Sequence, residues 1–104
     1  MSLVSIYVIF ASAEEAERIG EVVVAERLAA CINILPAVRS IYRWQGVLTR
    51  AEESAAILKT SADRGDALMS RIAALHSYEV PCIVTWPVDK ALASFSAWVE
   101  DSRD

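Results

Sequence analysis

The stretch CINILPAVRSIYRWQGVLTRAEESAAILKT, residues 31–60, decides the fold. Its first half alternates apolar and polar residues with the period of two that a β-strand shows; the apolar set is Ile32, Ile34, Val38, Tyr42 and Trp44. Pro36 cannot donate to a neighbouring strand, so it predicts a bulge or an edge there. Gln45-Gly46 supplies a tight turn. Residues 47–60 therefore return along the first strand and complete one long hairpin.

This hairpin is longer than the body that a chain of 104 residues can build. Fourteen strand residues span roughly 45 Å, whereas a domain of this size is roughly 30–35 Å across. The tip must bend or project, and a projecting tip leaves Ile41, Tyr42 and Trp44 in water unless another chain covers them. The hydrophobic fraction of 55% exceeds the average of about 45–50% and points the same way. We expect the chain to self-associate.

The other elements follow from periodicity and capping signals. Leu3 to Phe10 is a β-branched and aromatic run that predicts a central strand. Ser12-Ala13-Glu14-Glu15 matches a capping box, in which Glu15 reaches back to the cap, and predicts a helix from there to about Ala30. Ser61 caps a second helix that ends near His76. Residues 80–86 form an apolar strand closed by Pro87, and residues 95–99 form a short helix before a solvated tail, 100–104.

The resulting order is β-α-β-β-α-β with an added C-terminal helix. This is the split βαβ arrangement of ferredoxin-like α+β folds, an antiparallel sheet with two helices on one face. One such domain accounts for residues 1–104, because the chain is too short for two cores.

Composition excludes several classes of function. The sequence does not begin with a basic segment followed by a long apolar run, the pattern of a signal peptide. Its apolar runs are also too short to span a bilayer. We therefore expect a cytoplasmic protein without membrane insertion. In the reducing cytoplasm Cys31 and Cys82 are expected to be free thiols, although the sequence also allows a disulfide between them. Fourteen acidic residues against ten basic ones give a net charge of -4. Because the basic residues are scattered, nucleic acid is not an expected partner.

Most of the candidate chemistry lies in HSYEVPCIV, residues 76–84, which holds the only histidine. The three glycines stand apart, so no phosphate-binding loop is present, and neither cysteine lies in a motif for an activated nucleophile. We therefore expect no enzyme activity and no organic cofactor. A partly open or intersubunit metal site using His76, a thiolate and Glu79 would suit copper. Alternatively, His76 at a helix end caps the last carbonyls.

Lys59 is a further candidate for a functional residue, because a cation inside an apolar strand needs a carboxylate partner or access to water. Glu79, near the end of another strand, is one possible partner. The cysteines have a structural alternative too, as small buried apolar residues.

Several segments resemble the CutA divalent-cation tolerance family. They are AERLAACINILPAVRSIYRWQGVL at 25–48, LKT at 58–60, HSYEVPCIV at 76–84 and a tryptophan near the C-terminus. The resemblance implies a ferredoxin-like homotrimer whose hairpins wrap onto neighbouring subunits, with a link to divalent metals and copper in particular. Cys31 matches the family's cysteine, and His76, Tyr78 and Glu79 match its HPYEV-like segment, with Ser77 replacing the proline.

The family is also similar in architecture to trimeric PII-like signalling proteins. That likeness implies an alternative function, in which clefts between subunits bind a small ligand or a protein partner. Trp44, Lys59, Tyr78 and Glu79 are the expected lining residues of such a cleft.

Overall fold

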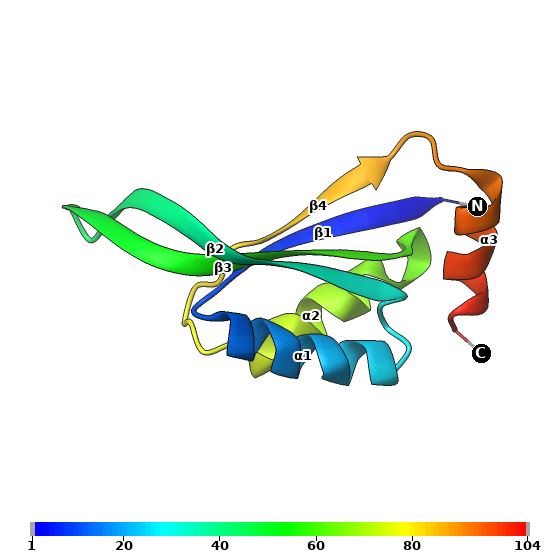
Figure 1. Ribbon diagram of the computed structural model, residues 1–104, viewed down its shortest axis with the longest axis horizontal. Helices are drawn as coiled ribbons and strands as arrows, with labels where there is room; N and C mark the ends of the chain where they lie inside the picture. Colours follow the sequence, from blue (N-terminus) through cyan, green and yellow to red (C-terminus); the bar gives the residue numbers. More distant parts are fainter. Residues whose placement is uncertain (1, 104) are drawn as a thin grey trace.

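The computed structural model describes residues 2–103, with two helices packed on one face of an antiparallel sheet and a third at its end (Figure 1). The elements in chain order are β1 (Leu3–Phe10), α1 (Ala13–Ala25), β2 (Cys31–Trp44), β3 (Val47–Ser61), a 3-10 turn (Ala62–Arg64), α2 (Gly65–Leu75), β4 (Ile83–Val88) and α3 (Ala93–Asp101). The sheet has the order β2-β3-β1-β4. This is the predicted α+β fold with its split βαβ topology.

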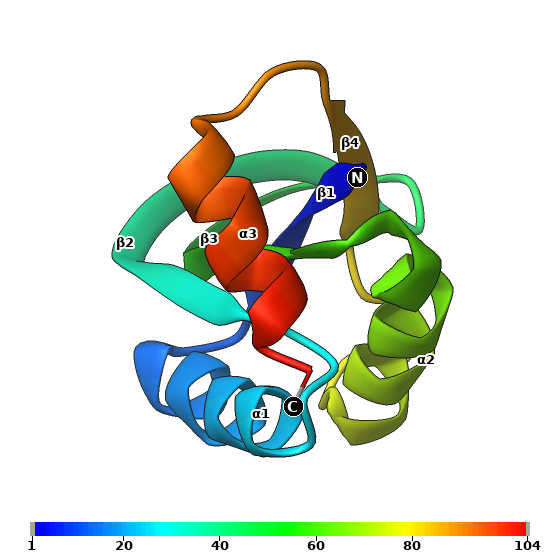
Figure 2. The same cartoon turned by 90° about the vertical axis from the view of Figure 1, so that its right-hand side faces the viewer.

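β1 is a central strand, as predicted, because it pairs with β3 on one side and β4 on the other. Its side chains Ile6, Val8 and Phe10 are fully buried against the helices, whereas Tyr7 and Ile9 on the other face are only half-buried. The end view in Figure 2 shows α1 and α2 below the sheet. No described helix is long and apolar enough to cross a membrane.

The β2–β3 hairpin projects beyond the rest of the molecule. β1 pairs with β3 only as far as Ser54, whereas β2 pairs with β3 out to Val47. The pairing slips between Leu35 and Val38, which confirms the irregularity predicted at Pro36. The turn residues Gln45 and Gly46 have φ values of 50° and 82°, typical of a two-residue hairpin turn. The longest dimension, 45 Å against 26 and 21 Å, reflects this projection (Figure 1).

The prediction that α1 extends to about Ala30 was wrong, because the helix ends at Ala25. Arg27 takes a left-handed conformation with φ of 64°. The amide of Arg27 donates to Val24 O at 3.0 Å, and that of Leu28 donates to Val23 O at 3.0 Å. This pair of bonds is a Schellman motif, in which arginine occupies the position that glycine usually takes.

Three other expectations also need correction. Glu15 reaches back to the amide of Ala11 rather than to that of the cap Ser12. The hydroxyl of Ser61 caps no helix. The last strand is Ile83–Val88 and includes Pro87, which it tolerates because β4 is an edge strand.

The C-terminal segment is docked, not solvated, as far as Arg103; Asp104 lies outside the described residues. The buried guanidinium of Arg64 donates to Arg27 O at 2.8 Å, beyond the end of α1, and to Val99 O at 2.8 Å in α3. Arg103 forms an ion pair with Asp63 at 2.8 Å. These arginines join the end of α3 to the turn after β3.

Gly20 brings α1 close to β2. A Cβ atom at Gly20 would lie 2.9 Å from Ile32 Cδ1 and 3.0 Å from Ile32 Cγ2. Gly20→Ala gains about 1 kcal/mol of helix propensity, but overpacking costs about 1–3 kcal/mol. We expect a net loss of about 1 kcal/mol in unfolding free energy, measured by chemical denaturation.

The matched control is Gly65→Ala, where the added atom meets only Val4 Cγ1 at 3.4 Å. This substitution is expected to be neutral or stabilising, by up to about 1 kcal/mol. Adding Ile32→Val to Gly20→Ala removes the nearer methyl group and is expected to recover part of the loss. Stabilisation by Gly20→Ala alone would contradict the close approach.

Candidate functional site

His76 closes α2 and fastens the loop 76–82 to the sheet. Its side chain is 9% exposed, and its ring stacks on Phe10 with centroids 5.1 Å apart and planes 9° apart. Nδ1 accepts the amide of Tyr78 at 3.0 Å. The proton therefore resides on Nε2, which donates to Ile9 O at 2.8 Å. Both ring nitrogens are occupied by backbone, so His76 must release one of these bonds before it can bind a metal.

Glu15 ties the start of α1 to the same loop. Its carboxylate is 8% exposed and accepts the amide of Ala11 at 3.1 Å and that of Ser77 at 3.0 Å. Burial raises the pKa of Glu15, but the hydrogen bonds from Ser77 and Ala11 outweigh burial and hold the pKa below its usual 4.5. Glu15 therefore stays ionised and fixes the loop where His76 leaves the helix.

Tyr78 extends the loop toward the hairpin. Its hydroxyl donates to Glu53 Oε2 at 2.6 Å, and its ring lies 4.9 Å from that of His76. Glu53 is a carboxylate of β3 that is only 8% exposed. Burial, and after it the hydrogen bond and charge of Glu53, raises the pKa of Tyr78 well above its ordinary 10.0. Tyr78 therefore remains a neutral donor at physiological pH.

An open groove of about 850 Å³ lies between this loop and the projecting hairpin. Trp44, Tyr78 and Glu79, three of the residues predicted for a cleft or metal site, line it together. Glu79 is exposed, and so is Cys82 on the same wall. The groove therefore combines aromatic rings, carboxylates and one accessible thiol.

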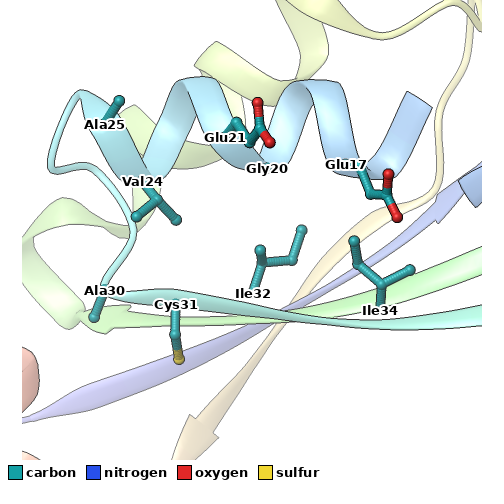
Figure 3. Close-up of a pocket in the computed structure, with 9 residues that line it drawn as sticks. All are labelled: Glu17, Gly20, Glu21, Val24, Ala25, Ala30, Cys31, Ile32 and Ile34. Atoms are coloured by element: carbon teal, nitrogen blue, oxygen red, sulfur yellow. The ribbon is translucent and has the colours of Figure 1, made fainter. Parts of the chain in front are cut away.

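Cys31 and Lys59 lie elsewhere. They are cross-strand partners, while Ile9, which binds His76, pairs with Ala55 four residues further along β3. Four residues correspond to about 13 Å, so Cys31 and His76 of one chain do not share a metal ion. Cys31 borders a second groove, beneath α1, but its side chain points away from the helix (Figure 3). Lys59 has no ion pair in the described region, so Glu79 is not its partner.

No group of three or more histidine, cysteine or acidic side chains that could hold a metal ion occurs among residues 2–103. His76 and Glu79 belong to one loop, but only Glu79 faces the groove. Any metal site that also uses Cys31 needs ligands from more than one chain.

Glu53 and Glu15 were missed as site residues in the sequence reasoning. A signal for Glu53 was present, because it has the same parity as Ala55 and Ile57 on a strand and therefore shares their face. Glu15 was recognised only as part of a capping box. Its bond to Ser77, 62 residues away, has no local signature.

The fold, the projecting hairpin and the loop that lies against it define a class of ferredoxin-like proteins with a long β2–β3 hairpin. Residues 4–102 match the family model described as CutA1 divalent ion tolerance protein. The chain therefore belongs to the CutA family.

Two bacterial and archaeal relatives are similar to the chain over most of their length. The divalent-cation tolerance protein CutA of Archaeoglobus fulgidus is 37% identical over 97 residues, 93% of this chain and 94% of the relative. That of Thermus thermophilus is 40% identical over 91 residues, 88% of each chain. The crystal structure of CutA from Xylella fastidiosa superposes with a TM-score of 0.96 at 34% identity, covering all of both chains. Family membership supports a role in divalent-cation tolerance.

The lowered pKa of Glu15 predicts a specific acid sensitivity. A carboxylate with a folded-state pKa below its unfolded one stabilises fully above the unfolded pKa, near 4.5, and loses that contribution as the pH falls through the folded pKa. Glu15→Gln is therefore expected to cost about 1–3 kcal/mol near neutral pH and much less in acid. Melting temperatures measured between about pH 7 and pH 3 test this.

Glu14→Gln is the matched control, since Glu14 is the exposed neighbour on the same helical turn. It removes the same charge without breaking a bond to the loop and should leave the acid sensitivity in place. An equal effect of both substitutions would show that Glu15 acts through general charge alone.

Proposed function

We propose that the protein is a non-enzymatic, cytoplasmic homotrimer that binds divalent metal, copper in particular, and confers metal tolerance. The observation that carries this proposal is the match of residues 4–102 to the CutA1 divalent ion tolerance family. Trimer, copper and compartment go beyond that match and rest on the arguments below.

Self-association is supported by apolar surface in two places. The hairpin tip exposes Ile41, Trp44, Val47 and Leu48. The sheet face opposite α1 and α2 carries Val84 and Trp86, which are also exposed. Apolar surface of this extent on one small chain is typical of a protein–protein interface. The edge strands β2 and β4 offer free backbone groups for pairing with other chains.

Copper binding is supported by the chemistry of the available donors. Cys31 and Cys82 are free thiols, and thiolate is a preferred ligand of Cu(I). We assign Cys31, His76 and Glu79 as the ligands, contributed by different subunits because one chain holds Cys31 and His76 apart. His76 would bind the metal through Nδ1, which carries no proton, and would give up the hydrogen bond from the Tyr78 amide while Nε2 keeps its bond to Ile9 O.

The compartment is proposed from the sequence alone. One related structure, from Archaeoglobus fulgidus, is described as a periplasmic divalent cation tolerance protein, with a TM-score of 0.94 and 34% identity over 98% of this chain and 99% of that one. Fractionation of the native cells decides between the two compartments for this chain.

A second function is favoured by the groove of about 850 Å³ between the hairpin and the loop 76–82. That volume is in the range of small-molecule sites, and three of the residues proposed to line a cleft between subunits, Trp44, Tyr78 and Glu79, border it. In this alternative the protein is a PII-like signalling trimer that binds a small ligand.

Calorimetric titration with Cu(II), together with competition for Cu(I) against a chromophoric chelator without oxygen, tests the metal proposal for the divalent ion and for its reduced form. Cys31→Ser removes a soft ligand and is expected to lower the Cu(I) affinity at least roughly tenfold. Glu79→Gln and His76→Ala are expected to lower it as well.

Cys82→Ser is the matched control, because it removes the other free thiol but none of the assigned ligands. Unchanged binding in Cys31→Ser would contradict the proposed site. Binding that survives His76→Ala unchanged would remove His76 from it.

A further inference from the structure

We propose that the groove between the hairpin and the loop 76–82 binds an organic ammonium compound, an amine with an apolar or aromatic chain. Its charged group would pair with Glu53, and its chain would lie along Tyr42 toward Trp44. This inference deepens the second candidate function and rests on it; the copper proposal does not depend on it.

The first support is the uncompensated charge of Glu53. The side chain is only 8% exposed, and within residues 2–103 its single hydrogen bond comes from the Tyr78 hydroxyl, with no ion pair. A buried carboxylate without a cation is costly. Because Tyr78 occupies Oε2, Oε1 remains free to accept a hydrogen bond from a ligand in the groove.

The register of the hairpin places aromatic rings on the same side as this carboxylate. Glu53 pairs with Val38, and Tyr42 and Trp44 follow Val38 by four and six residues. Even spacing keeps all of them on one face of the hairpin. The two rings stand about 13 and 20 Å further along the strand, and they are 39% and 49% exposed. An elongated ligand is needed to reach from Glu53 to Trp44.

The chemistry of the lining favours an organic cation over a metal ion. Too few metal-binding side chains gather among the described residues to complete a coordination shell, whereas tyrosine and tryptophan faces attract ammonium groups. Glu79 adds a second negative charge at the rim. Arg39 also borders the groove, but it is exposed and its cross-strand partner is Glu52, on the other hairpin face.

Isothermal titration of the assembled protein with three probes tests the inference. 3-Phenylpropylamine carries both charge and ring, 3-phenylpropan-1-ol has the ring without the charge, and propylamine has the charge without the ring. The first is expected to bind roughly tenfold to a hundredfold more tightly than the alcohol, since a charged hydrogen bond replaces a neutral one. It should also bind more tightly than propylamine.

Variants separate the contribution of the charged group from that of the aromatic ring. Glu53→Gln should abolish the preference for the amine over the alcohol, and the variant should still fold because the amide oxygen accepts from Tyr78. Glu52→Gln changes the net charge equally on the opposite face and should keep the preference. Tyr42→Leu should lower the affinity for the two phenyl probes roughly twofold to tenfold and leave the affinity for propylamine unchanged.

Equal affinity for amine and alcohol would overturn the inference, and so would an unchanged preference in Glu53→Gln. If no probe binds and Glu53→Gln dissociates the assembly, the carboxylate serves a subunit contact instead, and the inference is wrong. Copper binding is measured on the same sample. Because the amine proposal does not depend on copper, a failure to bind copper would leave the amine result unaffected, so the two proposals can fail separately.

Discussion

The structure depends on one mismatch of strand lengths within the sheet. β1 pairs with β3 only from Ser61 to Ser54, but β3 continues to Val47 with β2 as its only strand partner among residues 2–103. A two-stranded ribbon is marginal in water by itself. The outer half of the hairpin therefore relies on what lies against it, and on one side that is the loop 76–82, joined to it by the bond from Tyr78 to Glu53.

Buried polar groups do much of this joining. Glu15 and His76 fasten the loop to α1 and β1, and Arg64 joins the ends of α1 and α3 at the opposite end of the molecule. Each of these groups satisfies backbone atoms that secondary structure leaves unpaired. Apolar packing builds the body of the fold, while these few polar side chains hold its irregular segments.

Local patterns predicted the elements that local physics determines. The alternation in residues 31–44, the Gln45-Gly46 turn and the apolar run 3–10 each led to the correct element, and their order led to the correct fold. The end of α1 could not be predicted, because Arg27 adopts a conformation that its residue type disfavours. Docking of the C-terminal segment was also missed, since the bonds of Arg64 and Arg103 join residues about 35–40 positions apart.

The candidate site was predicted only in part, for the same reason. Trp44, Tyr78 and Glu79 share a groove within one chain, whereas the family resemblance implied a cleft between subunits and included Lys59, which lies elsewhere. The sequence carried no measure of the separation between Cys31 and His76, or of the backbone bonds that occupy the His76 ring. The separation follows from the strand register, and the bonds of the His76 ring follow from the conformation of the loop 76–82. Register and loop conformation both depend on how the whole sheet assembles.

The central claim is that the projecting hairpin is covered by other copies of the chain. Native mass spectrometry at micromolar concentration tests it most directly. The expected result is a particle of three times the 11.4 kDa chain mass. A monomer under these conditions would contradict it.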